Sequence, residues 1–270
     1  MRRAADGWWR ATWTPDGPAT VHLRERAGVV DAEAWGPGAG HVLDGVPGLM
    51  GLLDRPDGFD PSPHPVVAEL HRRLPGLRIG RTGAITEAAF PTICEQKVTT
   101  LEAKRSWRAA IRRWGEPAPG PAGLRLPPPA STLGRLPYWE LHRVGIERKR
   151  ADTIRRVARE AGRLDPMVAL GPVAVAARLE SIVGVGPWTS AEVNATALGD
   201  PDAVSVGDYH LPHQVSFALT GERRGSDERM LELLEPFRGH RQRVIRLILA
   251  SGIRPARRAP RYAPRDIAAI

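Results

Sequence analysis

Two glycines in the segment 179–189 constrain the fold of this chain more than any other feature. The segment reads Leu-Glu-Ser-Ile-Val-Gly-Val-Gly-Pro-Trp-Thr, with apolar residues at helical spacing before the glycines. Gly184 and Gly186 lack a Cβ, so they allow a positive φ and close approach of a partner. Pro187 suits the first turn of a second helix. We therefore predict a helix, a short hairpin and a helix whose free N-terminal N–H groups suit a phosphate oxygen.

The distribution of charge favours a polyanionic partner. The chain carries a net charge of +9; residues 1–70 hold 6 basic and 10 acidic side chains, and residues 71–270 hold 33 and 20. Only three of the basic residues are lysines. A GC-rich genome would explain the excess of arginine but not the asymmetry along the chain. A basic domain that faces nucleic acid explains both, and a merely solvated basic surface is the alternative.

Composition excludes several classes of protein. The 270 residues contain no 18-residue apolar run, and the N-terminus has no hydrophobic signal region. Cys94 is the only cysteine, which excludes an intrachain disulfide, a cysteine-rich zinc site and a four-cysteine iron–sulfur cluster. We expect a cytoplasmic, nucleoid-associated monomer with no membrane partner and no cofactor.

The patterning predicts a mainly α chain with a small α+β domain at its start. Residues 7–14, 19–26 and 28–35 have strand-like composition, and a helix near 41–54 contains Pro47, which can split it. We place this domain at 1–65, a helical domain at 66–253 and a basic, proline-rich tail at 254–270. Helices are expected at 66–74, 86–115 (one or two), 132–141, 151–162, 173–182, 188–198, 208–219, 229–237 and 241–250.

Asp208 is the second feature with a chemical implication. It follows Gly186 by 22 residues, in the sequence Gly207-Asp208-Tyr209, at the start of a predicted helix. Aspartate is a favoured N-cap, so a structural role is the simplest interpretation. The spacing also lets the chain return to the hairpin, where a carboxylate can stabilise positive charge on a sugar or activate water. Both interpretations stay open from the sequence.

Together these motifs resemble the helix-hairpin-helix (HhH-GPD) DNA glycosylase superfamily. Residues 179–189 resemble its hairpin, residues 199–208 its Gly/Pro-rich loop, and Asp208 its catalytic aspartate. The resemblance is closest to the alkylbase-removing branch typified by DNA-3-methyladenine glycosylase II, because Trp188 stands where bifunctional members carry a lysine. It implies a two-lobed helical domain that flips and hydrolytically excises 3-methyladenine-type bases from double-stranded DNA, without strand cleavage. The alternative is a non-catalytic DNA-binding protein in which Asp208 is only a helix cap.

The resemblance also implies roles for further residues. Asp208 would be catalytic, and the base pocket would contain Trp188, Tyr209 and Glu192, where Glu192 replaces a tyrosine of the family pattern. DNA would be contacted by Gly184, Val185, Gly186, Thr189, Gln96, Lys97, Arg148 and Lys149. Lys97 occupies the place of an apolar wedge, with a plain phosphate contact as its alternative. No protein-ligated metal is expected, although Na⁺ or K⁺ on the carbonyls of Val183 and Val185 fits the family.

Three other aromatic residues are assigned to the core. Trp107, Trp114 and Trp139 lie in helical patterns, which favours packing over base stacking. His210 and His213 are separated by two residues but have no further metal-type ligands nearby in sequence, so a zinc site is not expected there.

Overall fold

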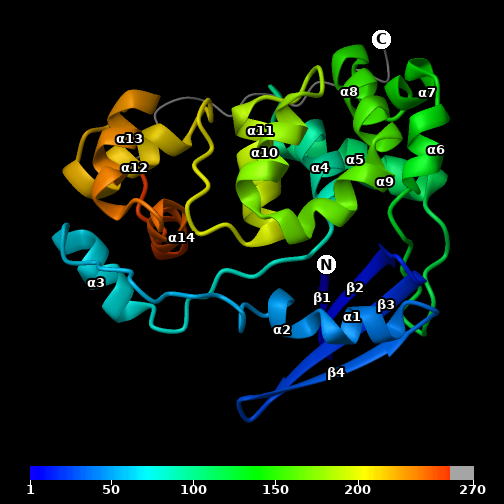
Figure 1. The fold of residues 1–270 in the computed structure, drawn as a ribbon, viewed down its shortest axis with the longest axis horizontal. Helices are drawn as coiled ribbons and strands as arrows, with labels where there is room; N and C mark the ends of the chain where they lie inside the picture. The colour runs from blue at the N-terminus through cyan, green and yellow to red at the C-terminus, as the bar shows by residue number, and fades with distance from the viewer. Residues whose placement is uncertain (256–270) are drawn as a thin grey trace.

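The structure, a computed structural model, describes residues 1–255 and consists of an N-terminal sheet domain followed by two helical lobes (Figure 1). No helix in this range is long and apolar enough to cross a membrane. The fold is mainly α, as predicted from the sequence. Most of the predicted basic tail lies outside the described residues.

The sheet domain is an antiparallel meander of four strands in the order β1-β2-β3-β4. The strands are β1 (Arg2–Ala4), β2 (Gly7–Thr14), β3 (Gly17–Arg26) and β4 (Val29–Trp35). The short strand β1 was not predicted. Ala19, Val21 and Leu23 alternate along β3 and form a small core with Val42, which lies on the helix α1 (Ala39–Asp44).

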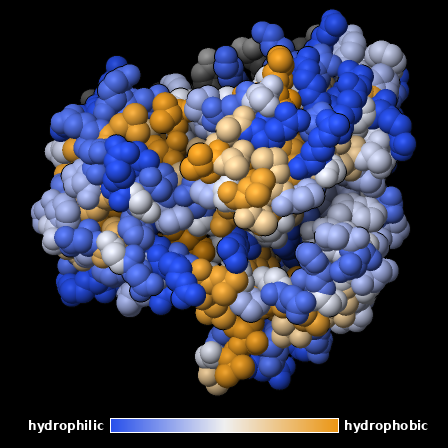
Figure 2. All heavy atoms as spheres, in the orientation of Figure 1, coloured by the Kyte–Doolittle hydropathy of each residue, from blue (hydrophilic) through white to orange (hydrophobic). Residues whose placement is uncertain are grey.

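The predicted helix near 41–54 is split, as Pro47 allowed. It forms α1 and α2 (Val46–Leu49), because Gly45 lies between them and Pro47 occupies the first turn of α2. Exposed apolar side chains of this domain include Val29, Leu43 and Leu52. Figure 2 shows apolar surface around this lower part of the molecule, on a face that is otherwise mostly hydrophilic.

The first lobe contains the helices of the central part of the chain, and its core is the largest of the protein. The expected helix at 86–115 is two helices, because residues 96–99 break the pattern. Its elements are α4 (Ile85–Glu95), α5 (Thr100–Trp114), α6 (Ala130–Arg135), α7 (Tyr138–His142), α8 (Arg148–Arg159), α9 (Ala161–Leu164), η1 (Asp165–Leu170), α10 (Pro172–Glu180), α11 (Pro187–Val193) and η2 (Asn194–Leu198).

The second lobe is built from two separate parts of the chain. It contains α3 (Pro65–Arg73), α12 (Leu211–Thr220), α13 (Asp227–Leu234), η3 (Glu235–Phe237) and α14 (Arg241–Ser251). Val67 and Leu70 of α3 are buried in the same core as Val215 and Ile248. Helix α3 thus joins the C-terminal helices, although more than 130 residues separate them.

Ion pairs and hydrogen bonds tie the sheet domain to the lobes. Asp54 lies just after α2 and forms a buried, bidentate ion pair with Arg243 of α14, with N–O distances of 2.7 and 2.8 Å. Arg10 of β2 pairs with Glu87 of α4 at 3.0 Å. The sheet domain is therefore bonded to both lobes.

The tryptophans predicted to lie in the core divide into two groups. Trp107 and Trp114 pack against the core of the first lobe. The prediction for Trp139 was wrong: 55% of this residue is exposed, and its ring meets Tyr138 edge-on. Helix α7 has only five residues, so the helical pattern was too short to identify its buried face.

Candidate functional site

The hairpin predicted from the two glycines lies between α10 and α11. Gly184 has φ +98°, and a Cβ placed there would lie 2.0 Å from Oγ1 of Thr153 on α8. Only glycine therefore fits. Gly186 does not use the positive φ that glycine allows, since its backbone is extended with φ −120° and a Cβ would meet nothing within 4 Å. The absence of a side chain at Gly186 instead leaves the start of α11 open.

The hairpin is held in place by the burial of Val185 and by hydrogen bonds from Gln96. Val185 is buried in the core of the first lobe, whereas Val183 is 72% exposed. Nε2 of Gln96, at the end of α4, donates to the carbonyl of Gly184 at 3.0 Å and to Oγ1 of Thr189 at 2.9 Å. Gln96 and Thr189, both predicted to contact DNA, are thus bonded to each other beneath the turn, and their DNA contacts stay predictions.

The other predicted DNA-binding side chains lie on the surface near this turn. Lys97 is exposed and has φ +55°, a strained value for a residue with a Cβ, at the connection between α4 and α5. Arg148 and Lys149 are exposed at the start of α8, where Arg148 lies 5.0 Å from the ring centre of Tyr138. The next residue differs: Arg150 is buried and donates to the carbonyl of Cys94.

Asp208 accepts hydrogen bonds with both carboxylate oxygens, and its catalytic role stays a prediction. Its Oδ1 accepts the backbone N–H groups of His210 (2.7 Å) and Leu211 (2.8 Å), so it caps α12, which begins three residues later than predicted. Its Oδ2 accepts Nε1–H of Trp188 at 3.0 Å. The hydrogen bond joins the hairpin helix α11 to the connection that leads into the second lobe. Since a carboxylate oxygen has two acceptor positions, Oδ2 can accept another bond.

Tyr209, which was predicted to line the base pocket, lies largely on the surface. The residue is 80% exposed, and its ring meets His210 edge-on at 4.9 Å and His213 at 6.4 Å. Because Asp208 is turned inward to cap α12, the neighbouring side chain faces outward.

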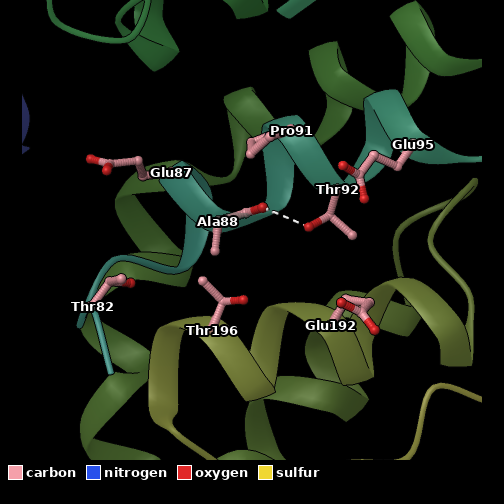
Figure 3. A pocket seen from close by; sticks show the side chains of 8 residues that line it. All are labelled: Thr82, Glu87, Ala88, Pro91, Thr92, Glu95, Glu192 and Thr196. Carbon is pink, nitrogen blue, oxygen red and sulfur yellow. Dashed lines mark hydrogen bonds between the residues drawn. The ribbon is translucent and has the colours of Figure 1, made fainter. Parts of the chain in front are cut away.

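A hollow of about 270 Å³ lies between α4 and the helix formed by α11 and η2. Its lining, drawn in Figure 3, consists of Thr82, Glu87, Ala88, Pro91, Thr92, Glu95, Glu192 and Thr196. Neither Trp188 nor Tyr209 belongs to it, so of the three predicted pocket residues only Glu192 lines the hollow. Glu192 follows Trp188 by four residues, which places both on one side of α11.

Three of the eight residues that line this hollow are glutamates. Glu95 of α4 and Glu192 of α11 extend into the same space, whereas Glu87 points away from Glu95 (Figure 3) and is paired with Arg10. Glu192 also accepts the hydroxyl of Ser205. Burial, aided by the negative charges of Glu192 and Asp208 and opposed by Lys104, raises the pKa of Glu95. The hollow is therefore suited to a positively charged or hydrogen-bond-donating group.

Sequence reasoning missed Glu95, which lies three residues after Thr92 and seven after Ala88. The spacing 88, 92, 95 does mark one face of a helix, but nothing in the sequence shows that this face meets α11. Burial raises the pKa of the Cys94 thiol to about 12, so Cys94 is not a nucleophile.

Comparisons with known proteins identify the fold of this chain. No family model matches the sequence, and a search of curated proteins finds no relative. Among solved structures, a 3-methyladenine DNA glycosylase from Archaeoglobus fulgidus matches with a TM-score of 0.77 at 20% identity, over 92% of this chain and 88% of that one.

Two further solved structures have the same architecture. The 8-oxoguanine glycosylase/lyase from Clostridium acetobutylicum, in complex with double-stranded DNA, has a TM-score of 0.66 at 14% identity, over 90% of this chain and 88% of that one. The 3-methyladenine DNA glycosylase Mag1 from Schizosaccharomyces pombe, in complex with abasic DNA, has a TM-score of 0.57 at 13% identity, over 77% and 96%. The chain therefore has the fold of the helix-hairpin-helix DNA glycosylases.

Proposed function

We propose that this protein is a monofunctional DNA glycosylase of base excision repair that removes cationic alkylated bases of the 3-methyladenine type. The observation that carries the proposal is that both carboxylate oxygens of Asp208 accept hydrogen bonds from the protein. One of its oxygens caps α12, and the other is held by Trp188 beside the hairpin. A cap alone needs only one oxygen.

In the proposed reaction the hairpin amides hold a backbone phosphate while the damaged nucleotide leaves the stack. The bond between C1′ and the base nitrogen breaks, and the base takes the electron pair. A base that was cationic leaves as a neutral molecule. The Asp208 carboxylate stabilises the positive charge on the sugar and accepts a proton from the water that adds to C1′. The strand stays whole, because Trp188 offers no amine for a Schiff base.

The carboxylates of Glu95 and Glu192 support a cationic substrate. Two partly buried acids with their negative charge close together repel each other, and a cationic base between them would relieve that repulsion. The family pattern relies on aromatic stacking in the base pocket, but this hollow has no aromatic residue in its lining. We infer that recognition here is electrostatic.

The decisive experiment measures base release from methylated duplex DNA by the wild type and by Asp208→Asn. Asparagine keeps the shape and can still cap α12, so a loss of about 100-fold or more would come from the missing charge. Equal release by both proteins would refute the mechanism. A strand nick without heat or alkali would refute the claim that the enzyme has no lyase activity.

The alternative, a non-catalytic DNA-binding protein, predicts salt-sensitive binding to duplex DNA but no base release from any lesion. A panel of cationic and uncharged lesions separates these cases and tests the pocket. Glu192→Gln should slow the release of cationic bases by about tenfold or more. Release of uncharged bases serves as the internal control, and an equal effect on both would contradict an electrostatic pocket.

A further inference from the structure

The resemblance to the family assigned Na⁺ or K⁺ to the carbonyls of Val183 and Val185, and the first of these already has a donor from the protein. Nη1 of Arg156 donates to the carbonyl of Val183 at 3.1 Å, and Nε2 of Gln96 donates to the carbonyl of Gly184 at 3.0 Å. A guanidinium is always protonated, and it repels a second cation at the same oxygen. Arg156 thus occupies one of the two expected carbonyl ligands, and its charge disfavours an alkali-metal ion at this turn.

Arg156 is placed for this contact by its helix. It lies one turn after Thr153, the residue that packs against Gly184, so α8 presents both side chains to the hairpin. Two neighbouring arginines line the same surface hollow of about 280 Å³ but have other partners. Arg159 donates to the carbonyl of Gly134 at 3.1 Å, and Arg178 pairs with Glu160. Arg156 is the arginine bonded to the turn.

We propose that the Arg156 guanidinium is the cation that stabilises this hairpin, in the structural role that a bound alkali-metal ion would otherwise have. It satisfies the exposed Val183 carbonyl, joins the turn to α8 and adds positive charge beside the amides of Gly186 and the first turn of α11. The conformation of the hairpin is then independent of which monovalent cation the solution contains. Arg156 is a positioning residue, because it acts through the hairpin backbone.

Hydrogen exchange of the hairpin segment 181–189, followed by mass spectrometry, tests this without any DNA. Exchange is compared in NaCl, KCl and tetramethylammonium chloride at one ionic strength, since the tetramethylammonium ion is too large and too weakly coordinating to replace Na⁺ or K⁺. In the wild type the rates should be the same in all three salts. In Arg156→Gln they should rise about tenfold or more in tetramethylammonium chloride, and Na⁺ or K⁺ should restore part of the protection.

Arg159→Gln is the matched control, because it removes the same charge from the same helix but leaves the hairpin contact. It should behave as the wild type does, and Arg156→Lys, which keeps a cation, should remain nearly independent of the salt. The proposal is overturned if wild-type exchange speeds up when tetramethylammonium replaces K⁺. It is equally overturned if Arg156→Gln exchanges no faster than Arg159→Gln.

A second measurement rests on the proposed function, since it needs DNA. The dissociation constant for a duplex with an abasic analogue, measured by fluorescence anisotropy, should be the same for the wild type in the three salts and should depend on the salt in Arg156→Gln. If the protein releases no base or binds no duplex, the proposed function fails, while the exchange experiment still decides the role of Arg156.

Discussion

Gly184→Ala should be among the most damaging single-methyl additions in this protein. The new Cβ would lie 2.0 Å from Oγ1 of Thr153 and 3.1 Å from both its Cβ and its Cγ2. Thr153 is only 2% exposed, and its hydroxyl donates to the carbonyl of Lys149 at 2.9 Å, so it has no free space to enter. The backbone would also hold an alanine at φ +98°.

The magnitude follows from adding these effects. A non-glycine residue in a sparsely populated positive-φ region costs about 1–3 kcal/mol, and overpacking a tight contact costs about 1–3 kcal/mol more. The lower entropy of the unfolded alanine chain offsets about 0.4–1 kcal/mol. We expect a loss of roughly 1–5 kcal/mol in the free energy of unfolding, measured by urea denaturation followed by circular dichroism.

Two companion variants make the test specific. Gly186→Ala adds the same methyl two residues later, where a Cβ meets nothing within 4 Å, so it should change stability by less than about 0.5 kcal/mol. In the double variant of Gly184→Ala with Thr153→Ala the worst overlap is removed but the backbone strain remains. Its loss should therefore be about 1–3 kcal/mol smaller than the sum of the single losses. Simple additivity, or a Gly184→Ala variant as stable as Gly186→Ala, would show that the reasoning is wrong.

Three further predictions concern buried ionisable groups. The raised pKa of Glu95 means that the folded state holds its proton more tightly, so stability falls as pH rises through that pKa; Glu95→Gln should melt at a higher temperature than the wild type near neutral pH, and the difference should vanish in acid. Asp54→Asn leaves Arg243 buried without its counter-charge and should cost about 3–5 kcal/mol in urea denaturation, more than Asp202→Asn, whose partner is less buried. Cys94, with a pKa of about 12, should react with a thiol reagent such as Ellman's only after denaturant is added, and reaction in the folded protein would contradict its burial.

Local features of the fold could be predicted from the sequence where glycine, proline and apolar spacing mark them. The hairpin around Gly184 and the break at Pro47 are such cases, because the backbone constraint is carried by the residue itself. The start of α12 was predicted at Asp208 but lies at Leu211, because Asp208 accepts the N–H groups of His210 and Leu211 in a turn before the helix. Asp208 fills its capping role from outside the helix.

The site was less predictable because it depends on contacts between distant segments. Trp188 and Asp208 are 20 residues apart, and Gln96 and Thr189 are 93 apart. The spacing allowed Asp208 to return to the hairpin, but it did not specify which side chains form these hydrogen bonds. The hollow is acidic because α4 faces α11. The sequence of α4 does not show which other helix its polar face meets. The family pattern pointed instead to Tyr209, which faces outward.

The position of α3 has a consequence for how the protein is made. Its apolar residues Val67 and Leu70 pack with helices that end at Ser251, so their partners do not yet exist when α3 leaves the ribosome. About 140 residues separate α3 from α12, which at roughly 5–20 residues per second takes on the order of 7–30 s. The sheet domain and the first lobe can fold in that interval.

The second lobe closes last, and with it the capped end of α12 that holds Asp208. A nascent chain would thus form its hairpin before Asp208, which accepts a hydrogen bond from Trp188, reaches its final position. During the wait the apolar stripe of α3 is open to chaperones or to other chains. A chain truncated after residue 200 and released from the ribosome should therefore protect the hairpin from protease but leave α3 exposed to cleavage.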